Sequence, residues 1–215
     1  MPFTVSAAQK KRLREIDRAI EDRYPYLAAD EARKAVGRGR DPTLGFGITP
    51  ASIVVHILKA AKATKRDIFF DIGAGPGNCV LGAALFVRES HGVEVLPKLA
   101  ALGTSAKREL KIKNARIHVR EFQKTNLSKG TIFFCYSTCF NKQIMLELGD
   151  AIAAAPDGAR VFTVSQALPH PAFEIVWRKE LSWGRGKGTR SLFYQVRKPR
   201  PLSGTRRGAR KAARR

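Results

Sequence analysis

The sequence predicts an α/β fold in which a doubly wound parallel sheet ends in an antiparallel hairpin. Between residues 68 and 164, short apolar runs alternate with stretches of helical periodicity, a pattern typical of βαβ units with helices on both faces of a parallel sheet. After residue 172 two longer apolar runs follow each other without a helical stretch between them, so these two strands must pair antiparallel. A chain of 215 residues, 44% of them hydrophobic, can bury one substantial core.

Helical periodicity predicts three helices before the alternating region. Leu13, Ile16 and Ile20 recur at helical spacing within residues 7–24, and a second helix is expected over residues 26–36. We expect a third helix that is capped by Thr49 and opens at Pro50.

The alternating region completes the outline of a class I SAM-dependent methyltransferase fold, a Rossmann-like sheet with a final hairpin. Helices are expected to begin at Asn78, Pro97 and Asn141. Strands are expected at residues 68–72, 91–95, 117–119, 132–136, 161–164, 173–183 and 192–196. We divide the chain into an N-terminal helical segment (1–43), a methyltransferase domain (44–196) and a disordered basic tail (197–215).

The chain is strongly basic, and the charge is densest at the C-terminus. It has 40 Lys and Arg residues against 18 Asp and Glu residues, a formal charge of +22 at pH 7. Residues 197–215 contain nine basic residues, no acidic one and almost nothing apolar, so we expect them to be disordered. A basic arm binds nucleic acid of any sequence by releasing counterions, which predicts DNA as a partner of the tail. The alternative is a tail that aids solubility or nuclear import.

Composition excludes several other protein classes. No apolar run approaches the roughly 20 residues that cross a bilayer, and the first twenty residues lack the apolar core of a signal peptide. We therefore expect an intracellular protein without a membrane partner. Cys79, Cys135, Cys139 and the four histidines show no zinc-ligand spacing, so neither a metal site nor a disulfide framework is predicted.

The most informative segment is the glycine-rich turn after the first strand of the alternating region. Gly73, Gly75 and Gly77 occupy alternate positions just before the helix that begins at Asn78. Glycines allow a sharp turn and the close approach of a ligand, and the helix N-terminus presents N–H groups to an anionic group such as an amino-acid carboxylate. Asp71, near the end of the strand, is placed to meet a ligand ammonium.

An acidic residue at the end of the next strand completes the pattern. Glu94 follows Asp71 by 23 residues, where a carboxylate can bind both ribose hydroxyls, and the combination predicts S-adenosylmethionine as the cofactor. A nicotinamide dinucleotide is the competing ligand, but the glycines are spaced G-x-G-x-G rather than G-x-G-x-x-G, and the hairpin fits poorly with a second mononucleotide half. A glycine turn that binds nothing is the third possibility.

Two further segments lie at the ends of later strands. Glu121 can accept a hydrogen bond from an adenine amino group and Phe122 can cover a face of the base; the alternative is a surface glutamate beside a core phenylalanine. The following strand ends in the run 136–140, at the edge where open α/β sheets bind ligands, and we expect the reactive methyl group to point there.

The run at 136–140 also limits which class of molecule can be the methyl acceptor. Methylation of adenine amino groups or glutamine amides in this fold generally uses a [D/N/S]-P-P-[Y/F] run at this point, whereas the chain has Y-S-T-C-F. Methylation at cytosine C5 needs a cysteine that usually follows proline, and none of the three cysteines does. A small-molecule acceptor would leave the basic tail unexplained.

With these motifs combined, the chain resembles the disruptor-of-telomeric-silencing family of non-SET histone lysine methyltransferases. The resemblance spans about residues 44–196. It rests on G-F-G-I-T-P at 45–50, D-I-G-A-G-P-G-N-C-V at 71–80, G-V-E at 92–94, E-F at 121–122, Y-S-T-C-F at 136–140 and E-L-S-W at 180–183. It implies a lysine of histone H3 on nucleosomes as the acceptor.

The resemblance also implies roles for individual residues. The donor would be held by Thr49, Asp71, Gly73, Glu94, Glu121 and Phe122, together with Gly75, Gly77 and Asn78 of the glycine turn. The catalytic acceptor channel would be formed by Tyr136, Ser137, Thr138, Phe140 and Trp183.

Three positions depart from the family pattern. The family usually reads N-N-F-x-F where this chain has Y-S-T-C-F, and Glu121 stands where aspartate is frequent. The tyrosine expected on the last strand aligns nearest Leu192 or Phe193, with Tyr194 beside them.

Methyl transfer to lysine requires alignment and a neutral amine. An aromatic channel that includes Phe140, Trp183 and Tyr194 would disfavour the ammonium form by desolvation. Ser137 and Thr138 would either bind the amine or cap the following helix. We expect a nuclear monomer that acts on nucleosomes. The alternatives are a cytoplasmic enzyme that methylates a lysine of a non-histone protein, an RNA methyltransferase, and a chromatin- or RNA-binding module without activity.

Overall fold

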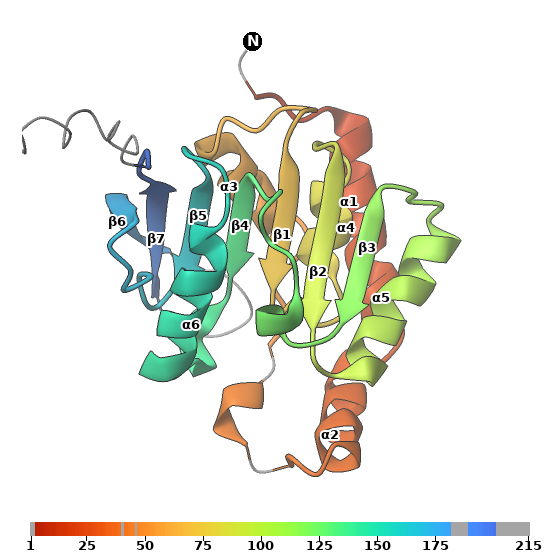
Figure 1. Ribbon diagram of the computed structural model, residues 1–215. Coiled ribbons are helices and arrows are strands. Elements are labelled where there is room, and N and C mark those ends of the chain that lie inside the picture. Colours follow the sequence, from red (N-terminus) through yellow and green to blue (C-terminus); the bar gives the residue numbers. More distant parts are fainter. Residues whose placement is uncertain (1–2, 40, 46, 182–188, 201–215) are drawn as a thin grey trace, which may run out of the picture.

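The computed structural model describes residues 3–39, 41–45, 47–181 and 189–200, and its centre is a seven-stranded sheet (Figure 1). The strand order is β3-β2-β1-β4-β5-β7-β6, in which β1 to β5 run parallel and β7 pairs antiparallel with both β5 and β6. The predicted doubly wound sheet with a final antiparallel hairpin is confirmed. The strands are β1 (Ile68–Ile72), β2 (Glu89–Glu94), β3 (Ala115–Val119), β4 (Ile132–Cys135), β5 (Arg160–Val164), β6 (Phe173–Leu181) and β7 (Arg190–Arg197).

Two helices of the alternating region begin at the predicted residue, and the third begins one residue later. These are α4 (Asn78–Ala83), α5 (Pro97–Glu109) and α6 (Lys142–Ala153). The side chain of Asn141 caps α6 by accepting the N–H of Ile144. Three short 3-10 turns lie in the connections: η1 (Pro42–Leu44), η2 (Phe122–Lys124) and η3 (Ser137–Cys139).

The N-terminal helices α1 (Ala7–Glu21) and α2 (Pro25–Ala35) pack onto the sheet domain. Leu13, Ile16 and Ile20 of α1 are buried in one hydrophobic cluster with side chains of α4 and β1. Burial of such side chains contributes roughly 1.5–3 kcal/mol each. The segment 1–43 therefore shares the core of the domain that follows it.

The third helix begins later than predicted. Helix α3 spans Ile53–Ala60, and neither Thr49 nor its N-cap residue Ser52 forms a side-chain capping bond. The N–H of Ala51 instead donates to the carboxylate of Asp17 on α1, at 2.8 Å. A tertiary contact has replaced the local cap, and residues 51 and 52 form a turn that precedes the helix.

The predicted tail also begins too early. Arg197 is the last residue of β7 and is buried; its guanidinium donates to the carbonyl of Ala153 and pairs with Asp157. The N–H of Lys198 donates to the carbonyl of Ala172 at 2.8 Å. Charge alone placed these residues in the tail, because the buried partners of an arginine are not visible in sequence. Residues 201–215, the rest of the predicted tail, lie outside the described residues.

The two faces of the sheet are covered unequally. Helices α1, α3, α4 and α5 lie behind the sheet in Figure 1, whereas α6 lies in front of β4. Within the described chain, the α-helices that pack against β2 and β3 are α4 and α5, both behind the sheet. In front, the connection that contains η2 packs Phe122 and Leu127 beside Val93 of β2, whereas no described α-helix covers β3. Among the same residues, no helix has the length and apolarity needed to cross a bilayer.

Candidate cofactor and acceptor site

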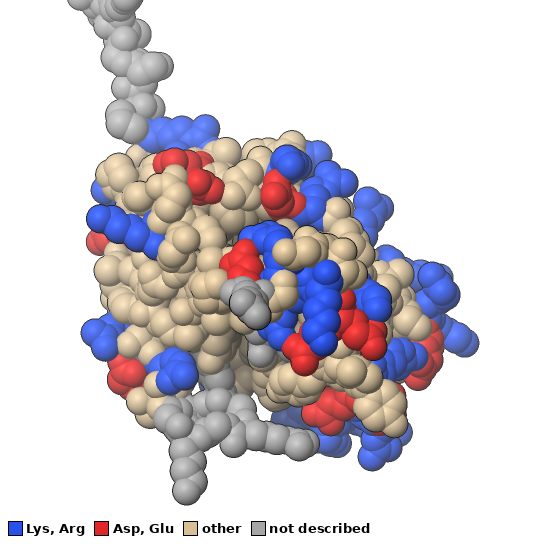
Figure 2. Space-filling view, turned by 90° about the horizontal axis from the view of Figure 1, so that it is seen from below, with Lys and Arg blue, Asp and Glu red and all other residues tan. Residues whose placement is uncertain are grey.

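A cavity of about 520 Å³ lies at the carboxyl ends of β1, β2 and β4. Figure 2 looks onto this edge of the sheet, where Lys and Arg side chains surround much of the surface. Among the residues predicted for the site, the lining includes Thr49, Asp71, Gly73, Gly75, Asn78, Glu94, Glu121, Phe122, Tyr136, Thr138 and Phe140. The fold thus brings together residues from five separate segments of the sequence.

The glycine turn has the backbone geometry that its composition predicts. Gly73, Gly75 and Gly77 all have positive φ, at 76°, 54° and 84°. At Gly77 the φ of 84° would strain any other side chain, and a Cβ would lie 2.5 Å from Cδ1 of Ile117, which would have to move. Gly77 supports the turn from behind and does not line the cavity.

Asp71 is a buried carboxylate in the cavity wall. It is 5% exposed, and no described residue donates a hydrogen bond to its side chain. Burial, with a smaller contribution from the negative charge of Glu94, raises the pKa of Asp71 to about 8. A buried acid without a partner is costly unless a cation arrives, so Asp71 is suited to a ligand ammonium.

Glu94 is also buried, but the backbone holds its carboxylate. Oε2 accepts the N–H of Gly75 at 2.7 Å, and Oε1 accepts the N–H of Leu96 at 2.8 Å. Burial raises the pKa of Glu94, and these backbone hydrogen bonds oppose the shift. Glu94 therefore fixes the glycine turn of the neighbouring strand, a role that the spacing of the two acids did not reveal.

Asp17 of α1 does not line the cavity but holds Asn78 of its wall, and the sequence analysis missed it. Its Oδ1 accepts the side-chain N–H of Asn78 at 2.7 Å as well as the N–H of Ala51. Burial raises the pKa of Asp17, whereas both hydrogen bonds lower it. A signal was present, because Asp17 lies four residues after Leu13 and three before Ile20, on the buried stripe of an amphipathic helix.

Glu121 and Phe122 lie at the rim of the cavity. The side chain of Glu121 is about half exposed and pairs with Lys124 at 2.7 Å, which lowers its pKa. Phe122 is buried between the cavity and the core. The geometry is compatible with both interpretations of this pair.

The turn after β4 supplies the opposite wall. Tyr136, Thr138 and Phe140 line the cavity, together with the exposed thiol of Cys139. Ser137 is fully buried and does not line it, because its hydroxyl donates to the carbonyl of Val164 at 2.6 Å. The alternative that Ser137 or Thr138 caps the next helix is wrong, since Asn141 does so.

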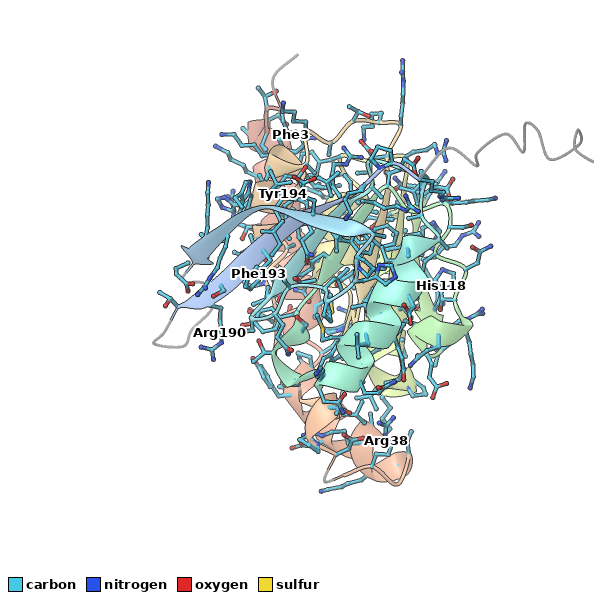
Figure 3. The ribbon with its side chains drawn as sticks, turned by 60° about the vertical axis from the view of Figure 1, so that its left-hand side comes forward. Phe3, Arg38, His118, Arg190, Phe193 and Tyr194 are labelled. Atoms are coloured by element: carbon cyan, nitrogen blue, oxygen red, sulfur yellow. The ribbon has the colours of Figure 1, made fainter. Side chains whose placement is uncertain are left out.

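The hairpin contributes differently from the prediction. Trp183 lies outside the described residues. Tyr194 stacks on Phe162, with ring centroids 4.6 Å apart, and does not line the cavity. Arg190 at the start of β7 and Arg38 line it instead; Figure 3 shows Arg38 at the lower end of the molecule and Arg190 at the end of the hairpin. Neither arginine belongs to a motif that sequence reasoning could single out.

Both the sequence and the fold of the chain resemble those of known proteins. Residues 43–181 match the family described as "Histone methylation protein DOT1", which is well over half of the chain. The chain belongs to this family. A histone-lysine N-methyltransferase, H3 lysine-79 specific, from Cryptococcus neoformans var. neoformans serotype D is 22% identical over 156 residues, covering 65% of this chain and 24% of the relative. The chain thus spans about a quarter of the length of that DOT1-family relative.

Solved structures with the same fold include methyltransferases. An RNA methyltransferase from Salinibacter ruber, in complex with S-adenosyl-L-homocysteine, has a TM-score of 0.60 at 15% identity and covers 74% of this chain and 98% of that one. TrmN from Thermus thermophilus has a TM-score of 0.60 at 17% identity and covers 74% of this chain and 52% of its own. At such identities the likeness shows the fold alone, which confirms the predicted class I methyltransferase fold. No group of three or more potential metal ligands occurs among the described residues.

Proposed function

We propose that the chain is an S-adenosylmethionine-dependent protein lysine N-methyltransferase whose acceptor is a lysine of histone H3 on nucleosomes. The observation that carries the proposal is the pair of buried carboxylates at neighbouring strand ends, Asp71 without a partner and Glu94 held by two backbone N–H groups. Membership of the histone methylation family supports the acceptor class.

The residues fit the cofactor at three points. Asp71 would bind the ammonium group of the cofactor's amino-acid part, and Phe122 would contact the adenine. Glu94 would bind the ribose hydroxyls through the lone pairs that the backbone N–H groups leave free. When bound, the cofactor supplies an activated methyl group on a sulfonium. Thr49, Gly73, Gly75, Gly77, Asn78 and Glu121 complete the proposed donor site, by contact or by support of the turn.

The chain's own contribution to the reaction is alignment and desolvation. Holding the amine in line with the methyl group can lower the barrier by roughly 7–11 kcal/mol. Tyr136, Thr138 and Phe140 form a partly apolar wall that disfavours the ammonium form of the lysine, so its proton can leave to solvent. Ser137 supports this wall indirectly, because its hydrogen bond to Val164 fixes the turn. Trp183 is proposed as a further channel residue on the basis of the family resemblance.

The test uses labelled S-adenosylmethionine with nucleosomes, free histone H3 and nuclease-treated cell extract, followed by mass spectrometry. Label on an H3 lysine, retained after nuclease treatment, is the expected result. Label on another protein would show that the acceptor is a lysine of a non-histone protein. This is the next candidate, because residues 136–138 differ from the family pattern. Label lost with nuclease would overturn the lysine assignment.

The proposal includes nuclear location and DNA binding through residues 201–215, which carry six basic residues and no acidic one. Deleting these fifteen residues should lower activity on nucleosomes at physiological salt at least 10-fold and leave donor affinity unchanged, because tethering raises the local acceptor concentration. Arg197 to Arg200 stay in the variant, since they contact the core. Equal activity of the two proteins on nucleosomes would contradict the tether.

A further inference from the structure

The front of β2 and β3 carries a row of nearly parallel rings beside a row of cations. Phe70 of β1 stacks on His91 of β2 with ring centroids 4.8 Å apart, and the ring of His118 of β3 continues the row, with its centroid 5.4 Å from that of His91. The interplanar angles are 20° and 19°, so the three rings lie nearly parallel. His118 is partly exposed and ends the row of rings toward the sheet edge.

Strand alternation places basic residues on the same side of β3 as His118. Ile117 points into the core behind the sheet, so Arg116, His118 and Arg120 share the front. Arg116 and Arg120 are exposed, and among the described residues neither guanidinium forms an ion pair. Two acids lie near this face: Glu89 is engaged by His91 at 3.2 Å and by Arg88 at 3.5 Å, and Glu121, next to Arg120, pairs with Lys124 at 2.7 Å.

We propose that this face, defined by His91, Arg116, His118 and Arg120, binds single-stranded nucleic acid. A base can stack on the open end of a row of rings, and arginines beside it can bind the adjoining phosphates. Stacking favours unpaired bases, because a base within a duplex has no free face. The charge of +22 favours a polyanion, and Arg120 also lines the cavity, so the face continues to the mouth of the candidate active site.

The two imidazoles are suited to stacking. Burial lowers the pKa of both His91 and His118, so each ring is neutral at physiological pH. Nδ1 of His91 and Nε2 of His118 lie 3.2 Å apart, which fits one hydrogen bond between neutral rings. The groups that face them are Glu89 from β2 and Arg116 and Arg120 from β3. Figure 3 labels His118 on the flank of the sheet that faces away from the hairpin.

Photocrosslinking of the full chain to a uridine-rich RNA containing 4-thiouridine tests the surface directly. Mass spectrometry should find adducts in the peptides of β2 and β3, around His91 and His118. Adducts confined to residues 201–215 would overturn the proposal, because they would show a tail that binds any polyanion. This readout does not depend on a variant that folds.

Variants separate stacking from charge. His118→Ala should weaken binding of a single-stranded oligonucleotide about 5- to 100-fold and have little effect on an abasic oligonucleotide of equal charge, whereas His118→Phe should restore binding.

The charge of the surface is tested at Arg116. Arg116→Ala should lower the slope of log affinity against log salt concentration by about 0.7. The matched control is Arg14→Ala, an exposed arginine of α1 on the other side of the sheet. Equal losses for Arg116→Ala and Arg14→Ala, or equal affinity for the abasic strand, would contradict a specific surface. The outcome is independent of methyltransferase activity.

Discussion

The donor half and the acceptor half of the cavity are built by different means. On the donor side, Asp71 and Glu94 are buried, and backbone geometry at the glycine turn fixes their surroundings. On the acceptor side, Thr138 and Cys139 are exposed, and side-chain contacts hold the turn to β5. The donor half is thus specified by backbone and burial, whereas the acceptor half can change its side chains while the fold is kept.

The largest expected effect is on the donor half, at Glu94. Glu94→Ala removes the proposed ribose contact and leaves the N–H groups of Gly75 and Leu96 without acceptors. Since each hydrogen bond to a charged group is worth about 1.5–3 kcal/mol, donor affinity should fall 100-fold or more in calorimetry. Glu94→Gln, which keeps the shape, should lose less. Undiminished affinity in Glu94→Ala would remove the basis of the cofactor assignment.

Asp71 should link donor binding to pH. The pKa of Asp71 is about 8 in the folded protein, against the ordinary value of 3.8. Between these two pH values, Asp71 is therefore protonated in the folded protein and ionised in the unfolded chain. Stability should therefore fall as pH rises from about 4 to 8, and donor affinity should rise as pH approaches 8, since the ammonium needs the carboxylate. Asp71→Asn should flatten the stability profile in denaturant titrations and weaken the donor at least 10-fold. Identical profiles for the two proteins would show that Asp71 is ionised throughout.

Asp17 should have a smaller effect, because it acts through Asn78 and Ala51. Asp17→Ala removes both hydrogen bonds and should lower donor affinity about 5- to 10-fold. Asp17→Asn is the conservative control, since its amide oxygen can accept both bonds and should restore most of the affinity in calorimetry. A loss of thermal stability with unchanged affinity would assign Asp17 to folding alone.

The contrast between backbone-determined and side-chain-determined parts of the site also explains which features could be predicted from the sequence. The glycine turn, Asp71 and Glu94 were readable because backbone conformation and strand ends restrict residue type at fixed spacings. Arg38 and Arg190 were not, since each reaches the site through tertiary packing from a distant segment. For Asp17, the apolar stripe of α1 signals a buried acid but does not reveal its partners Asn78 and Ala51. The late start of α3 and the burial of Arg197 have the same cause, a long-range partner that overrides a local preference.

The smallest effects on donor affinity should appear at the acceptor turn, where two adjacent hydroxyls should behave differently. Ser137→Ala leaves the buried carbonyl of Val164 without its donor and should lower the free energy of unfolding by about 1–3 kcal/mol. Thr138→Ala loses an exposed contact to Ser165 at 2.7 Å and should change stability by less than about 0.5 kcal/mol. Thr138 faces the cavity, so its loss should instead alter turnover on the acceptor at constant donor affinity, measured with labelled donor at saturation. If Thr138→Ala weakens the donor as strongly as it slows turnover, the two halves of the cavity are not separable.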